Sequence, residues 1–180
     1  MLVVGLACLS ASAFARDDEL EAYSAVAMGT GGAVGAKSMQ FSFNIKEFTS
    51  DEQLQKYAAL LKEKGQDALR RALEKENIGQ IRPAARVGNP IAIARKRQTE
   101  SGSVITIVTA RQMPFIEVYN SGRSVDYPFG FLQVQLDAKG QGMGKIMAAA
   151  KIRFDKKKGK YEIESFGNQY IKAVNVRPEK

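Results

Sequence analysis

The stretch from Lys145 to Ser165 (KIMAAAKIRFDKKKGKYEIES) constrains the fold more than any other part of the sequence. From Ile146 to Phe154, small or apolar residues occupy every second position, which is the period of a β-strand. A basic turn follows, and residues 160–165 alternate again. The stretch therefore predicts a β-hairpin with small and apolar side chains on one face and mostly charged side chains on the other.

The charges of the two strands also predict the register of this hairpin. If Asp155 lies opposite Lys160, apolar pairs stack on one face and opposite charges meet on the other. The expected partners are Phe154 with Tyr161, Arg153 with Glu162, Ile152 with Ile163 and Lys151 with Glu164. Each such pair contributes roughly 0.2–1 kcal/mol, and a slip of one residue would lose both sets at once.

The rest of the chain predicts one α+β domain over residues 16–180, with a helical hairpin at about 50–77 and a β-rich part at 78–177. Ser50 and Gln53 have the spacing of a capping box, and Gly65 is expected to end the first helix. The expected architecture is an antiparallel β meander, curled or barrel-like, of about seven to nine strands with the helical hairpin inserted.

Alternating apolar residues indicate several of these strands. Phe41, Phe43 and Ile45 mark an early strand, and Leu132 and Val134 point inward from a later one. The segment 81–87 contains Pro83 and therefore suits an edge position. Residues 170–176 predict a closing strand, with 177–180 as a frayed tail.

Residues 1–15 (MLVVGLACLSASAFA) have the features of a signal peptide. A short apolar run is followed by small residues that end in Ala13-Phe14-Ala15, and charged residues begin at Arg16. We therefore expect cleavage after Ala15 and export to the periplasm or beyond the cell. The segment is too short to span a bilayer, so no transmembrane segment is predicted.

Composition narrows the range of chemistry that the mature chain can perform. The chain contains no histidine, and its single cysteine, Cys8, lies in the predicted signal peptide. A thiol nucleophile, a disulfide and a Cys/His metal site are therefore not expected, and neither is a cofactor. The glycine-rich segment 28–37 is followed by a strand rather than a helix, which argues against a phosphate-binding loop. No catalytic residue is assigned.

The formal net charge of +8 and the isoelectric point near 9.6 favour anionic partners. Nucleic acid is not among the expected partners, because Glu162 and Glu164 offset Lys151 and Arg153 and because export removes the usual targets. Electrostatic attachment to an anionic envelope surface remains an alternative, whereas the lysines of the Lys156–Lys160 turn are expected to keep the hairpin tip soluble.

A ligand site is expected beside the irregular segment 113–127, since functional side chains often lie on loops next to a rigid sheet. Small side chains that point inward would leave room for an apolar ligand or for close packing of the helical hairpin. The candidate binding residues are Tyr119, Arg123, Asp126 and Tyr127 in and around that segment, together with Ala148 and Ala150. A carboxylate-dependent hydrolase that uses Glu117 or Asp126 is an alternative.

Three segments resemble exported bacterial proteins of unknown function. They are QDALRRAL at 66–73, DYPFG at 126–130 and KYEIESFGNQYIKA at 160–173. The resemblance implies export and a single domain, and it implies no activity. The leading hypothesis is an exported, non-enzymatic domain that binds an apolar small ligand or a partner on a curved sheet.

Overall fold

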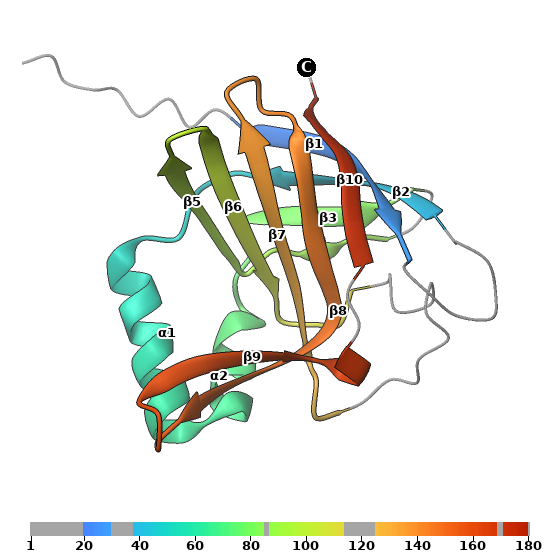
Figure 1. Ribbon diagram of the computed structural model, residues 1–180. Coiled ribbons are helices and arrows are strands. Elements are labelled where there is room, and N and C mark those ends of the chain that lie inside the picture. Colours follow the sequence, from blue (N-terminus) through green and yellow to red (C-terminus); the bar gives the residue numbers. More distant parts are fainter. Residues whose placement is uncertain (1–19, 30–37, 85–86, 114–124, 169–170, 180) are drawn as a thin grey trace, which may run out of the picture.

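The computed structural model describes residues 20–29, 38–84, 87–113, 125–168 and 171–179. The described chain forms one antiparallel sheet with two helices packed against it (Figure 1). The strands are β1 (Glu21–Met28), β2 (Ser38–Ile45), β3 (Gly79–Pro83), β4 (Asn89–Pro90), β5 (Ile93–Thr99), β6 (Gly102–Thr109), β7 (Phe129–Asp137), β8 (Gly142–Asp155), β9 (Lys160–Ser165) and β10 (Ile171–Pro178). The helices are α1 (Asp51–Lys64) and α2 (Gln66–Leu73), and a 3₁₀ turn spans Phe166–Asn168.

The sheet is a curled half-barrel, as predicted. Its strand order is β4-β3-β2-β1-β10-β8-β7-β6-β5, and β9 pairs with β8 outside this path. Strands β5–β8 cross steeply over β1–β3 (Figure 1), and a large apolar cluster fills the space between them. Near one end the two halves are joined by Thr49, which follows β2. Its backbone N–H donates to the Ala94 carbonyl of β5 at 2.8 Å, and its Oγ1 accepts from the Ala94 N–H at 3.0 Å.

The alternation of apolar residues explains why one face of each strand is buried. Tyr23 on β1 and Phe43 on β2 are register partners, and their rings stack with centroids 5.0 Å apart. Both side chains lie in the large cluster, which we call the inner core. The intervening residues, such as Ser24 and Ser42, face away from it.

The helical hairpin begins and breaks where its sequence predicts. The Ser50 Oγ accepts from the Gln53 backbone N–H at 3.2 Å, and the Gln53 side chain accepts from the Ser50 N–H at 2.9 Å, so the capping box is complete. Gly65 ends α1 with a φ of +79°, a value that glycine adopts without strain. No helix in the described part of the chain is long and apolar enough to cross a membrane.

The predicted register of the β8–β9 hairpin is confirmed at every expected pair, from Lys151 with Glu164 to Asp155 with Lys160. This hairpin forms an arm that reaches beyond the sheet and lies against the helices (Figure 1). The Tyr161 hydroxyl donates to the Ala58 carbonyl of α1 at 3.0 Å, and the Lys62 ammonium lies 5.3 Å from the centre of the Phe154 ring.

The prediction that β8 keeps one apolar face along its whole length is wrong. Phe131 pairs with Met147 but Phe129 pairs with Ala150, so β8 holds one residue more than β7 between these positions. Such a bulge reverses the face to which alternate side chains point. Ala148 therefore lies in the inner core, whereas Ala150 lies in a second apolar cluster with the helices.

Two other predictions about strands need correction. β3 spans Gly79–Pro83 rather than 81–87, and the two-residue strand β4 pairs with Gln80 and Ile81 on its outer side. The tail predicted to be frayed is partly in a strand, since Arg177 and Pro178 belong to β10 and pair with Ser24 and Tyr23. β10 itself lies in the middle of the sheet, between β1 and β8.

We expect Phe43→Ala to lower the free energy of unfolding by about 3–5 kcal/mol, because its side chain is only 1% exposed and the ring stacks on Tyr23. Ile163→Ala is the matched control, since that side chain is 41% exposed on β9 and its truncation should cost about 1 kcal/mol or less. Denaturant unfolding measures both, and equal losses would contradict the assignment of Phe43 to the core.

Candidate functional site

The structure describes four of the six predicted ligand-binding residues. Tyr119 and Arg123 lie outside the described residues, as does Glu117. The side chain of Asp126 is exposed, and its backbone carbonyl accepts a hydrogen bond from the Gln66 amide at 3.1 Å.

Tyr127 makes a hydrogen bond with Glu164 and a ring contact with Phe166. Its hydroxyl donates to the Glu164 carboxylate of β9 at 2.6 Å, and this hydrogen bond raises the pKa of the phenol. The ring meets the Phe166 ring edge-on, with centroids 5.2 Å apart. Tyr127 therefore joins the start of β7 to the β8–β9 arm.

The two predicted alanines lie in different places. Ala148 is buried in the inner core, and Ala150 is fully buried against the helices, on the far side of the bulge. The structure therefore separates Ala148 from Ala150. Packing of the helical hairpin, one of the two expectations for these small residues, is observed at Ala150.

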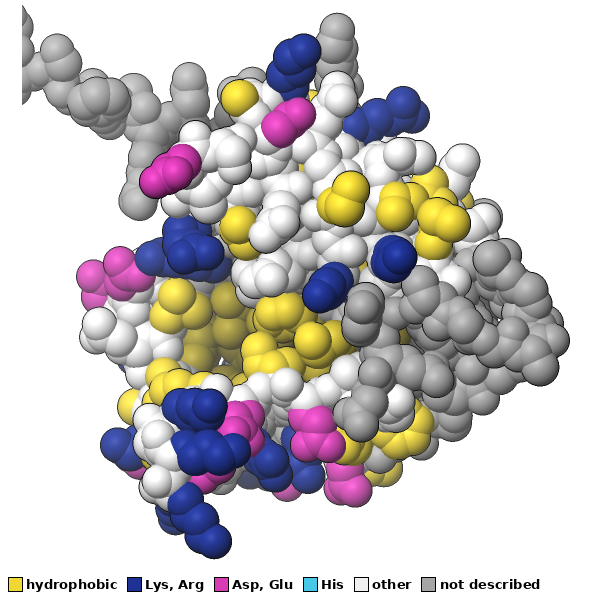
Figure 2. Space-filling view, in the orientation of Figure 1, with side chains coloured by type: hydrophobic (Ala, Val, Ile, Leu, Met, Phe, Trp, Pro, Cys, Tyr) yellow, Lys and Arg dark blue, Asp and Glu magenta, His cyan; other side chains and the backbone are white. Residues whose placement is uncertain are grey.

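The second apolar cluster marks the first candidate surface. It joins the helical hairpin to the outer face of the sheet, and a hollow floored by apolar side chains opens there, between the sheet and the layer of α1 and β9 (Figure 2). We call it the apolar recess. The cluster consists of Leu61, Leu69, Leu73, Ala92, Val108, Ala110, Phe129, Phe131, Ala150 and Ile152, with Tyr57, Ile93 and Met147 packed against it and partly exposed.

One polar contact ties α1 to the segment that follows α2, beside the apolar recess. The Tyr57 hydroxyl donates to the Glu76 carboxylate at 2.9 Å. Burial of the ring and this hydrogen bond raise the pKa of Tyr57 to about 12. Lysine and arginine side chains lie around the margin of the hollow in Figure 2, together with some aspartate and glutamate side chains.

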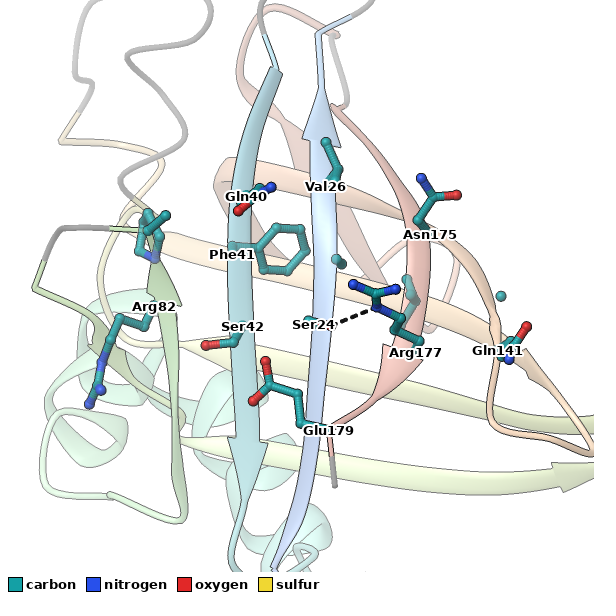
Figure 3. A pocket seen from close by; sticks show the side chains of 15 residues that line it. Ser24, Val26, Gln40, Phe41, Ser42, Arg82, Gln141, Asn175, Arg177 and Glu179 are labelled. Carbon is teal, nitrogen blue, oxygen red and sulfur yellow. Dashed lines mark hydrogen bonds between the residues drawn. The ribbon is translucent and has the colours of Figure 1, made fainter.

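A second hollow lies on the opposite half of the sheet, over β3, β2, β1 and β10 (Figure 3). Its volume is about 790 Å³, within the range of small-molecule sites. Eight of its fifteen lining residues are polar, and six of these eight are exposed, so we call it the polar trough. Its charged residues are Arg82, Arg177 and Glu179.

Strand register places a row of polar residues across the polar trough. Arg82 pairs with Ser42, Ser42 with Ser24, and Ser24 with Arg177. The four residues thus cross four neighbouring strands on one face, with an arginine at each end. The Arg177 Nε donates to the Ser24 Oγ at 3.4 Å, and Arg82 donates to the side chain of Gln80.

A bulge in β10 builds one side of the polar trough. The register of β10 shifts against both of its neighbours, at positions 174–176, and Asn175 has a φ of +53°. Because of the extra residue, Val176 enters the inner core while Asn175 and Arg177 on either side are exposed. Figure 3 shows Arg177 extending from β10 toward β1.

Sequence reasoning missed the polar trough because its residues come from distant segments. The polar positions of β1 and β2 can be identified from the alternation of apolar and polar residues, and Gln40 and Ser42 of β2 are examples. The pairing of β10 with β1 cannot be identified from alternation, and without this pairing Arg177 cannot be placed near Ser24.

No family model, curated protein or solved structure matches the chain.

Tyr57→Phe should reduce the loss of stability at alkaline pH. Because the pKa of Tyr57 is raised in the folded protein, the unfolded chain releases this proton first. The free energy of unfolding therefore falls from about pH 10 to about pH 12, and phenylalanine removes that contribution. In the variant, part of this decrease in the free energy of unfolding should remain, because burial and Glu21 also raise the pKa of Tyr23.

Denaturant titrations across this range measure the effect, and ultraviolet absorbance gives an independent check. At about pH 11, folded wild type and variant should contain the same amount of phenolate, because Tyr57 is still mostly protonated. A loss of one phenolate in the variant would contradict the raised pKa.

Proposed function

We propose that the protein is an exported, non-enzymatic domain that binds an apolar small ligand with a negatively charged group. The binding site in this proposal is the apolar recess. The observation that carries it is the apolar hollow in Figure 2, together with Tyr57, Ile93 and Met147, which pack against the buried second cluster and are themselves partly exposed. Export rests on the sequence of residues 1–15.

The apolar lining supports a ligand with a hydrocarbon part. Tyr57, Ile93 and Met147 are partly exposed around buried members of the cluster, so a ligand could cover them without rearranging the inner core. Removing apolar surface from water contributes about 25 cal/mol per Å². A hydrocarbon chain seated on these side chains would therefore be bound mainly by burial.

The charges near the apolar recess support an anionic group on the ligand. Lys62 follows the buried Leu61 in α1, and Lys145 lies two residues before Met147 on the same face of β8. The whole chain has a net charge of +8, which favours the approach of anions. A fatty-acid-like molecule combines the two properties, an apolar chain and a carboxylate.

Purified protein of residues 16–180 should bind an anilinonaphthalene sulfonate dye at micromolar concentration, and dodecanoate should displace the dye. Met147→Glu should weaken dye binding about tenfold or more, because it places a carboxylate among the apolar side chains. Fluorescence titration measures both affinities.

Met143→Glu is the matched control. Met143 lies on the same face of β8, four residues away, but is 66% exposed and outside the second cluster. Its substitution should change dye affinity less than twofold. Equal weakening by both variants, or no binding by the wild type, would contradict the proposal.

Export predicts that a mature form begins at Arg16. Expression in a bacterium with a periplasm should give a secreted or periplasmic product whose first residue, read by N-terminal sequencing, is Arg16. Ala13→Lys should block cleavage, because the site requires small residues at this position. Ser10→Lys leaves both alanines in place and shows whether added charge alone stops processing. Mature protein that retains residues 1–15 would contradict this part of the proposal.

A further inference from the structure

We propose that the polar trough is a second binding site, and that its ligand is an acidic glycan, a chain of sugars that carries carboxylate or sulfate groups. The site lies over β3, β2, β1 and β10, whereas the apolar recess lies against the helices (Figures 2 and 3). The two sites share no residue, so either can exist without the other.

The row of polar residues across the polar trough favours an extended ligand. Arg82 and Arg177 stand at its two ends, separated by Ser42 and Ser24 on the two strands between them. Neighbouring strands are about 4.8 Å apart, so the Cα atoms of the arginines are separated by roughly 14 Å. An extended ligand that lies across the strands can meet both arginines, whereas Figure 3 shows the Arg82 side chain pointing away from Arg177, so a single small anion does not bridge them in this arrangement.

The two arginines supply the affinity for anionic groups. A guanidinium group can donate two parallel hydrogen bonds to a carboxylate or sulfate, which makes it the side chain best suited to such groups. Within the described part of the chain, neither arginine forms an ion pair with a carboxylate. Their printed partners, Gln80 and Ser24, are uncharged.

The uncharged side chains indicate a ligand rich in hydroxyl groups. Gln40, Gln141 and Asn175 present amides around the polar trough, and the two serines present hydroxyls. Amides and hydroxyls both donate and accept hydrogen bonds, as sugar hydroxyls do. The polar trough can therefore satisfy a polyol along its length between the two arginines.

Glu179 distinguishes a glycan from a polyphosphate. With two arginines and one glutamate, the lining has a net charge of +1. A carboxylate repels a chain that carries a negative charge on every unit, but it accepts hydrogen bonds from hydroxyls. A glycan with a few acidic groups suits this lining better than a uniformly charged polymer.

The bulge in β10 positions two side chains of this site, Asn175 and Arg177. It brings Asn175 and Arg177 to the exposed side of the strand, beside β1, and it holds Asn175 at a positive φ. Bulges commonly redirect side chains in this way. Arg177 then extends over Ser24, which gives the row its second arginine.

The experiment uses the mature chain and three probes of matched length, namely oligogalacturonate, the uncharged maltooligosaccharide and polyphosphate. Calorimetric titration should show binding of oligogalacturonate that weakens as salt is added. Arg82→Gln and Arg177→Gln should each weaken that binding about three- to tenfold. Arg97→Gln, which removes an exposed arginine of β5 that does not line the polar trough, should change it less than twofold.

Three results would overturn the proposal. They are no binding of oligogalacturonate at millimolar concentration, equal weakening by all three arginine variants, and tighter binding of polyphosphate or of the uncharged oligosaccharide. Nuclear magnetic resonance of the side-chain amides gives a second readout that does not depend on the variants. Oligogalacturonate should shift the signals of Gln40, Gln141 and Asn175, and a shift confined to other amides would also count against this site.

Discussion

The extra residue of β8 opposite β7 determines how the helices and the sheet fit together. Before it, β8 turns Ile146 and Ala148 into the inner core. After it, Ala150 and Ile152 face outward and meet Leu61 and Leu73 of the helices. One strand therefore contributes to two apolar clusters on opposite faces, and the apolar recess exists because the second cluster lies outside the half-barrel. Without the bulge, the strand would direct all these side chains to one face.

Local patterns predicted most of the fold. The register of the β8–β9 hairpin, the capping box at Ser50 and the break at Gly65 depend on residues that are near one another in the chain, and all three are confirmed. The predicted face is wrong where one extra residue changes the alternation of side chains, as in β8. An alternating pattern of small residues reads the same with or without a bulge, because Ala148, Ala149 and Ala150 are alike.

The candidate sites were harder to predict than the fold for the same physical reason. The residues of the polar trough come together through the pairing of β10 with β1. That pairing joins segments about 150 positions apart, and no local propensity encodes it. The two proposed sites differ in chemistry because they lie on different parts of the outer face of the sheet. The helices partly cover the part that holds the apolar recess, and they leave open the part that holds the polar trough.

The position of β10 also orders events during synthesis. Strands β1–β4 form one group and β5–β9 form another. β10 lies between the two groups and pairs with β1 on one side and with β8 on the other. Until residues 171–178 have been made, the two groups lack this shared strand and the inner core is open on that side. A sheet whose two groups are joined by residues 171–178 therefore cannot be completed until this part of the chain has been made.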